Sequence, residues 1–215
     1  MDQENQITMN KNTYKALFIS VVIIFILNGC ISITKELPAQ KTYTLSLEDR
    51  GNKISNTFYN KTIRIYEPKA LNSINTKAIL YSKNSIEQEG YALSTWSDKP
   101  SKMIQQLVSK YLTQKNSYKY ITTTNIKISN NYRLISELVE FKQTFTKTKS
   151  YADFSIRVYL INNDTQKVYF KSFTYNKLSD TNNAKGLVFG LNNISNTFLV
   201  DLQKFIQASL KQDAT

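Results

Sequence analysis

The chain has 215 residues and a formal net charge of +12, and it contains no histidine and a single cysteine. Catalytic triads with a histidine base and zinc sites built from Cys and His are therefore excluded. The five glycines form neither a GxGxxG nor a P-loop pattern, so nucleotide binding has no support. Carboxylate pairs such as Glu87 with Glu89, or Glu137 with Glu140, have the chemistry of a hydrolase, but scattered acidic residues are usually just solvated. We predict a non-enzymatic protein without a cofactor or a metal site.

The N-terminal segment has the order of a secretory signal. Lys11 and Lys15 precede a largely apolar run, 16–27, and small residues follow it. The run is shorter than the roughly 20 residues of a membrane-spanning helix, which argues against a transmembrane anchor. Met1 and Met9 both precede this segment, and the sequence leaves open which of them is the natural start.

Cys30, the single cysteine, lies directly after Leu27, Asn28 and Gly29 at the end of this signal. Bacterial lipoproteins carry their lipid anchor at this position: a diacylglycerol is attached to the thiol, the chain is cut before the cysteine, and the new amine is acylated, commonly with palmitate. A free cysteine buried in a core is the alternative, and the place at the end of a signal disfavours it. We predict that residues 1–29 are a signal peptide and that the lipidated Cys30 attaches the mature protein to a membrane.

Basic side chains outnumber acidic ones by 28 to 16. Such a balance favours anionic partners, either phospholipid headgroups or nucleic acid. A secreted, membrane-tethered protein does not meet nucleic acid routinely, so we predict no nucleic-acid partner. The lysines are spread over almost every segment and form no dense cluster, so the charge also fits a plain compositional bias.

A short tether and one domain are predicted after the signal. Residues 30–40 contain Pro38 and no periodic pattern, whereas 41–210 shows no composition shift, repeat or long linker. Alternating apolar residues predict strands over 41–47, 62–66, 78–81, 90–96, 118–124, 134–146, 154–160 and 168–175. The last two strands form a hairpin around the turn residues Asn162, Asn163 and Asp164. In the strand over 134–146, residues of one parity are expected to face the core: Ile135, Val139, Phe141 and Phe145.

Two segments have helical spacing instead of alternation. Apolar residues from Met103 to Leu112 predict a helix, with Pro100 near its first turn. A long amphipathic helix is predicted over the stripe Leu187, Leu191, Ile194, Phe198, Leu202, Phe205 and Leu210, which we expect to pack on the sheet rather than on a partner. The fold class is therefore α+β, a mostly antiparallel sheet covered by a mid-chain helix and a long C-terminal helix.

Several motifs resemble one family over nearly all the mature chain. They are an opening Tyr43-Thr-Leu45 and an aromatic strand with Tyr91 and Trp96, which is followed by Pro100 and a helix. This order is similar to the ABC-type transport auxiliary lipoproteins, the PqiC-like family. We expect Tyr91 and Trp96 to belong to the core rather than to a contact surface, because a large aromatic beside a helix start usually packs.

A further motif supports the resemblance, and two positions depart from the family pattern. The long helix begins with the glycine-rich Gly186-Leu-Val-Phe-Gly190, as expected for the family. Thr95 and Ser82 stand where the family often has arginine, so no role of those arginines carries over.

The resemblance implies a non-catalytic lipoprotein accessory to a lipid-trafficking system. In such systems an inner-membrane ABC transporter and an MCE-domain protein move phospholipid across the periplasm, and the lipoprotein docks to the MCE assembly. Ile31 follows Cys30 in place of the aspartate that commonly retains lipoproteins at the inner membrane, which indicates the outer membrane, facing the periplasm. Self-association into a homo-oligomer stays open, as do two alternatives: a pilotin-like assembly lipoprotein and a surface-exposed structural lipoprotein.

Overall fold

The computed structural model describes residues 12, 14–15, 18–20, 38–48, 57–123 and 128–214. The chain divides into two compact units, Met1–Pro38 and Ala39–Thr215. The signal motif of Leu27, Asn28, Gly29 and Cys30 lies outside the described residues. Within the described ranges, no helix has the length and apolar character needed to cross a membrane.

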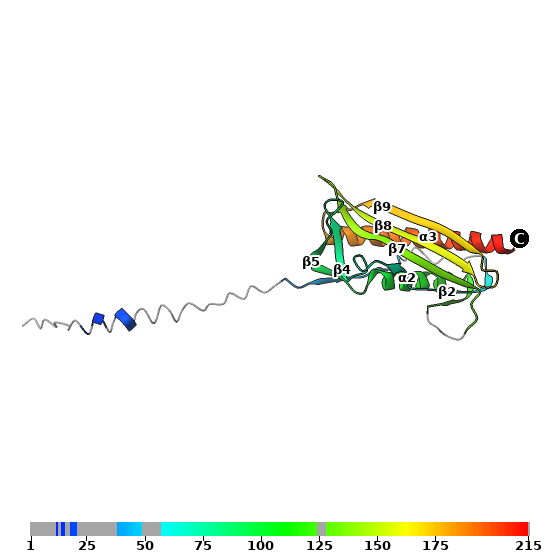
Figure 1. Ribbon diagram of the computed structural model, residues 1–215, viewed down its shortest axis with the longest axis horizontal. Coiled ribbons are helices and arrows are strands. Elements are labelled where there is room, and N and C mark those ends of the chain that lie inside the picture. The colour runs from blue at the N-terminus through cyan, green and yellow to red at the C-terminus, as the bar shows by residue number, and fades with distance from the viewer. Residues whose placement is uncertain are drawn as a thin grey trace, which may run out of the picture. The chain divides into compact units, whose positions relative to one another are not determined.

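The described residues of the unit Ala39–Thr215 form an α+β fold with a single sheet and two helices (Figure 1). The helices are α2 (Pro100–Gln114) and α3 (Ala184–Ala214). The strands are β1 (Lys41–Tyr43), β2 (Tyr59–Ile65), β3 (Lys69–Ala70), β4 (Ala78–Ser82), β5 (Glu89–Trp96), β6 (Tyr118–Thr122), β7 (Tyr132–Phe145), β8 (Ser150–Asn162) and β9 (Val168–Leu178).

Strand β7 organises the sheet because both of its edges are paired. One edge pairs with β8 in an antiparallel ladder over the whole length of both strands. The other edge is shared by three parallel strands in succession, β2 near the start of β7, β3 in the middle and β4 near its end. Beyond these, β6 pairs with β2, β5 with β4 and β1 with β5, and β9 extends the sheet past β8.

The predicted α+β class is confirmed, with the mid-chain and the C-terminal helix in place. The sheet is mixed: the longest ladders, β7 with β8 and β8 with β9, are antiparallel, while the short strands along the far edge of β7 pair in parallel. The two-residue β3 was not predicted, because a segment so short carries no alternation.

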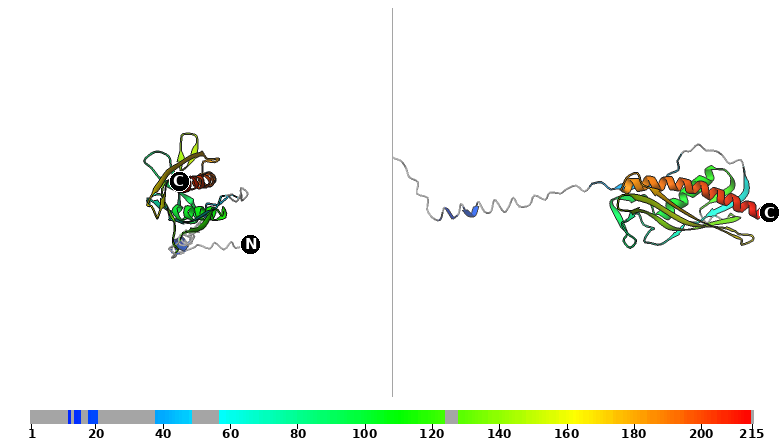
Figure 2. Two further views of the ribbon diagram at one scale, coloured as in Figure 1. Left: turned by 90° about the vertical axis from the view of Figure 1, so that its right-hand side faces the viewer. Right: turned by 90° about the horizontal axis from the view of Figure 1, so that it is seen from above.

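The core lies between the sheet and the two helices. Figure 2 shows α3 running along one face of the sheet. Inward residues of β8 alternate and are almost fully buried: Ala152, Phe154, Ile156, Val158 and Leu160. The predicted stripe of α3 packs on them, with Phe205 partly buried and Ile206 taking the deeper position beside it. All buried core residues in the described ranges belong to the unit Ala39–Thr215, so this unit contains within itself the packing that folds it.

The predicted inward face of β7 is wrong for the first half of the strand. A β-bulge between Leu138 and Glu140 shifts the register against β8. Before the bulge the buried parity is that of Leu134 and Leu138, and after it the buried residues are Phe141 and Gln143. Because the extra residue of a bulge reverses the facing of everything beyond it, one parity cannot describe the whole strand.

Candidate binding groove

Strand β1 brings the N-terminal end of the domain to the start of α3. It pairs in parallel with β5, Tyr43 opposite Trp96, and the backbone N–H of Ser97 donates to the carbonyl oxygen of Tyr43 at 2.7 Å. The chain then leaves the sheet. Residues 44–48, which we call the β1 extension, lie against α3 instead of continuing as the predicted strand to residue 47.

Two asparagines one helical turn apart hold the β1 extension. The Asn192 side-chain oxygen accepts from the backbone N–H of Ser46 at 2.8 Å, and its amide donates to the carbonyl of Thr44 at 3.3 Å. Asn196 repeats the pattern two residues on, accepting from the N–H of Glu48 at 3.0 Å and donating to the carbonyl of Ser46 at 3.1 Å.

The spacing of this ladder has a simple geometric origin. Four residues of an α-helix rise about 6 Å, and two residues of an extended chain rise about 6.6 Å. A side-chain amide has the same donor and acceptor pair as a peptide group. Asn192 and Asn196 therefore offer the β1 extension the hydrogen bonds that a neighbouring strand would offer.

A side-chain cap and a glycine fix the start of α3, which carries Lys185, Val188 and Phe189. The Asn183 side chain caps the helix by accepting from the backbone N–H of Gly186 at 3.1 Å. A Cβ atom on Gly186 would lie 2.1 Å from the carbonyl oxygen of Thr181, so only glycine allows the preceding turn to fold back onto the helix. This contact gives a physical reason for the glycine at the helix start.

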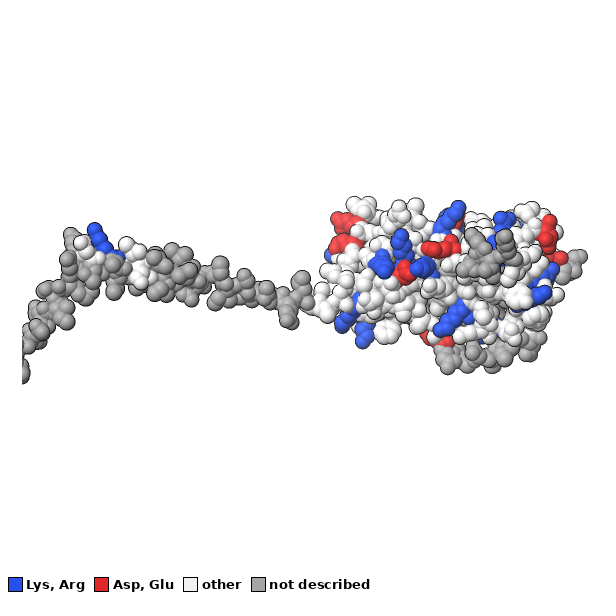
Figure 3. Space-filling view, turned by 90° about the horizontal axis from the view of Figure 1, so that it is seen from below, with Lys and Arg blue, Asp and Glu red and all other residues white. Residues whose placement is uncertain are grey.

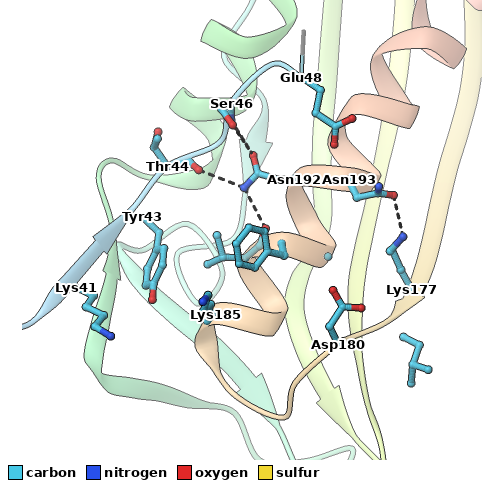
Figure 4. Close-up of a pocket in the computed structure, with 14 residues that line it drawn as sticks. Lys41, Tyr43, Thr44, Ser46, Glu48, Lys177, Asp180, Lys185, Asn192 and Asn193 are labelled. Carbon is cyan, nitrogen blue, oxygen red and sulfur yellow. Dashed lines mark hydrogen bonds between the residues drawn. The ribbon is translucent and has the colours of Figure 1, made fainter. Parts of the chain in front are cut away.

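A groove of about 650 Å³ lies between the β1 extension, the end of β9 and the start of α3 (Figure 4). Its charged side chains are Lys41, Lys177, Lys185, Glu48 and Asp180, and its apolar ones include Leu178, Val188 and Phe189. Lysines thus outnumber carboxylates in the lining. Lys177 donates to the side-chain oxygen of Asn193 at 3.1 Å, and the Lys185 ammonium lies 5.7 Å from the ring centre of Phe189.

Elsewhere the charges are mixed. Figure 3 shows basic and acidic side chains interspersed on one face of the molecule. Among the described residues, ion pairs such as Lys83 with Glu89 and Arg157 with Glu137 are largely exposed, and exposed pairs contribute little to stability. The described part of the chain has no group of three metal-binding side chains.

The motif residues fall into two groups. Tyr43 lines the groove and Leu45 is buried beside it in the β1 extension. Trp96 is 1% exposed, with its ring centre 5.3 Å from that of Phe141, and Pro100 is buried at the first position of α2. Trp96 and Pro100 therefore lie in the core and not at the groove.

Tyr91 is partly buried and anchors a polar cluster inside the sheet. Its hydroxyl donates to the side-chain oxygen of Gln143, which is fully buried and donates in turn to Ser150 at 2.8 Å and Ser179 at 3.3 Å. Burial, and to a lesser extent the nearby Tyr81, raises the pKa of Tyr91 to about 12. The phenol is thus a neutral donor at any ordinary pH.

Sequence reasoning missed the groove, although one signal for it exists. Asn192 and Asn196 lie in α3 close to the apolar stripe, where a polar side chain needs a partner. The identity of that partner, a segment about 150 residues earlier in the chain, is not encoded in the local pattern.

Comparison with known proteins shows the fold and leaves the family open. No family model matches the sequence, and no curated protein matches it. The crystal structure of a Xanthomonas campestris protein, described by the family model DUF330, is similar with a TM-score of 0.70 at 13% identity, covering 81% of this chain and 99% of that one. An uncharacterized protein is similar with a TM-score of 0.63 at 9% identity, covering 78% and 99%. This chain has the fold of these proteins.

Proposed function

We propose that this chain is an outer-membrane lipoprotein that faces the periplasm and serves a phospholipid-trafficking system as a non-catalytic docking component. Its partners are an MCE-domain protein and, through it, an ABC transporter. The observation that carries the proposal is the shared fold with the DUF330 protein, which extends over nearly the whole of that protein. DUF330 is the family of the PqiC-like lipoproteins, and the sequence resembles the same family through Tyr43, Tyr91 and Trp96.

A binding role, rather than a chemical one, is supported by where the carboxylates lie. Glu89 accepts a hydrogen bond from the Tyr81 hydroxyl, and Glu137 pairs with Arg157 at 3.6 Å. Both are surface contacts that use the carboxylate to hold a neighbouring strand residue. The chain has no histidine to act as a general base at neutral pH.

The tether sets where docking takes place. Residues 30–40 span less than about 40 Å even when fully extended, since each residue adds at most about 3.6 Å. A domain held by Cys30 therefore stays close to its membrane, within reach of the part of a partner that approaches this surface.

The test is a pull-down of the full chain from its own bacterium, with a C-terminal tag and solubilised envelopes. We expect an MCE-domain protein and ABC transporter subunits to be recovered, and we expect the Cys30→Ser variant to lose membrane anchoring in detergent partitioning. An unrelated tagged lipoprotein is the control for non-specific recovery. Recovery of an outer-membrane assembly machine instead, or digestion of the protein on intact cells by added protease, would favour the pilotin-like or the surface-exposed alternative.

A further inference from the structure

The groove combines exposed basic and exposed apolar side chains at its mouth. Lys41 and Lys185 are exposed and form no ion pair within the described part of the chain. Phe189 is 58% exposed and Leu178 is 49% exposed, and both line the same groove. Lysines beside a protruding aromatic and an aliphatic side chain are the pattern of a surface that enters the interface of an anionic membrane.

Lys185 also lies where a helix does not favour it. It is in the first turn of α3, which carries no acidic residue. The N-terminus of a helix has a partial positive charge, so a lysine there is unfavourable and an anion is favourable. An anion held between Lys185 and Lys41 would offset the repulsion between the Lys185 ammonium and the positive end of the helix. The same helix end would attract the anion.

The groove is at the end of the domain where the tether arrives. Lys41 lines the groove and begins β1, and only ten residues separate it from Cys30 in the sequence. A short stretch of sequence therefore joins Cys30, the proposed anchor, to a residue of the groove, whereas β2 and β6 lie near the opposite end of β7.

We infer that the groove between β1, β9 and α3 binds the headgroup phosphate of an anionic phospholipid at the membrane surface. Lys41, Lys177 and Lys185 supply the positive charge, and Phe189 with Leu178 enters the layer between headgroups and acyl chains. The inference rests on the lipid anchor of the proposed function, but not on the MCE partner. The lysines outnumber the two carboxylates of the groove, Glu48 and Asp180, so the local charge complements a phosphate.

The test is flotation of the unlipidated unit 39–215 with vesicles of phosphatidylcholine, with and without phosphatidylglycerol. We expect flotation with the phosphatidylglycerol vesicles and its loss at high salt, because surface charges are screened. The double variant Lys41→Gln/Lys185→Gln should bind about thirty-fold more weakly, since each lysine near an anionic surface contributes a factor of about five. Phe189→Ser should also weaken binding, whereas Lys41→Arg should retain it.

Matched changes at the other end of the domain are the controls. Lys61→Gln/Lys119→Gln removes the same charge from β2 and β6, and Phe58→Ser removes a phenylalanine that is 60% exposed. Thermal melting of each variant shows that it is folded. The inference would be overturned if the parent unit did not float, or if it bound equally to vesicles without phosphatidylglycerol. An equal loss of binding in the control variants would also overturn it. None of these results depends on whether an MCE protein is recovered with the full chain.

Discussion

Gly190 of α3 and Ala152 of β8 lie so close that a Cβ atom added to Gly190 would be 2.7 Å from the Cβ of Ala152. Real Cβ atoms do not approach so near, so helix and strand reach this separation only because one of the two residues is glycine. The approach brings Leu187 and Leu191, both fully buried, onto the sheet. This contact therefore fixes how α3 lies over the hairpin.

The first prediction is that Gly190→Ala destabilises the domain even though alanine favours a helix. The gain in helix propensity is about 1 kcal/mol, while forcing a methyl group into a packed core costs typically 1–3 kcal/mol. We expect a net loss of about 1 kcal/mol in the free energy of unfolding, measured by chemical denaturation.

A compensating change makes this prediction sharp. Ala152→Gly removes the methyl group that Gly190→Ala would meet, so the double variant should be more stable than the sum of the two single changes predicts. If the effects of the two single changes on the free energy of unfolding simply add in the double variant, the contact does not limit the approach of α3 to β8.

The hairpin of β8 and β9 and the stripe of α3 are predictable because each depends on a local period. Phe154, Ile156 and Val158 alternate without interruption, and their ladder with β9 has no irregularity. In β7, by contrast, the bulge at Val139 leaves that residue 39% exposed although its parity with Phe141 predicts burial. A bulge without a glycine, such as the one between Leu138 and Glu140, has no strict sequence signature. The strands that pair with β7 therefore set its conformation here.

The groove is less predictable than the fold because it is built from distant segments. The motif Tyr43-Thr-Leu45 indicates an ordered N-terminal strand, but its contact with α3 depends on two side-chain amides far along the chain. The conformation of residues 44–48 therefore follows from tertiary contacts, which a local pattern does not contain.

The second prediction concerns these amides. Asn192→Ala removes the acceptor for the N–H of Ser46 and the donor for the carbonyl of Thr44. We expect faster amide hydrogen exchange at Ser46 with a loss of about 1–2 kcal/mol in the free energy of local opening, because each such hydrogen bond contributes about 1 kcal/mol. The remaining protection of the β8 and β9 amides should be unchanged.

Asn193→Ala is the matched control for this experiment. Asn193 is the adjacent residue of α3, and its side chain accepts from Lys177 instead of binding the β1 extension. Exchange at Ser46 should stay as in the parent protein. Equal acceleration by both variants would contradict the amide ladder.

The third prediction concerns pH and the carboxylate near the end of α3. Burial opposes ionisation of Asp213, but hydrogen bonds from Tyr132 at 2.6 Å, from Tyr169, and from Asn162 at 2.7 Å, with Lys167 nearby, outweigh it and lower the pKa of Asp213. A pKa that is lower in the folded than in the unfolded state stabilises the fold above the unfolded-state value of about 3.9. This contribution is lost as the pH falls through the folded-state pKa.

Asp213→Asn should therefore lower the free energy of unfolding by about 2 kcal/mol at neutral pH, because an amide cannot accept all these hydrogen bonds. The difference in the free energy of unfolding between this variant and the parent protein should shrink as the pH falls below the ordinary carboxylate pKa of about 3.9. Melting curves recorded across this range measure it. Asp164→Asn, an exposed carboxylate in the turn before β9, is the control and should change little. A constant difference at every pH would exclude the ionised Asp213 as the cause.

The last prediction concerns Tyr91 and Gln143. Tyr91→Phe leaves the buried side-chain oxygen of Gln143 without the hydroxyl that it accepts from, and such a loss costs about 1–3 kcal/mol in the free energy of unfolding. Tyr120→Phe, at a tyrosine that is 50% exposed on β6, should change the free energy of unfolding by less than about 0.5 kcal/mol.

The pH dependence of the same pair tests the account further. Because burial raises the pKa of Tyr91 to about 12 from an ordinary value of 10.0, the protonated phenol stabilises the fold at pH values below 10.0. This contribution is lost as the pH rises toward 12. The parent protein should thus lose more stability over that alkaline range than Tyr91→Phe does, in denaturant titrations at each pH, and parallel curves for the two proteins would rule out this account of the polar cluster.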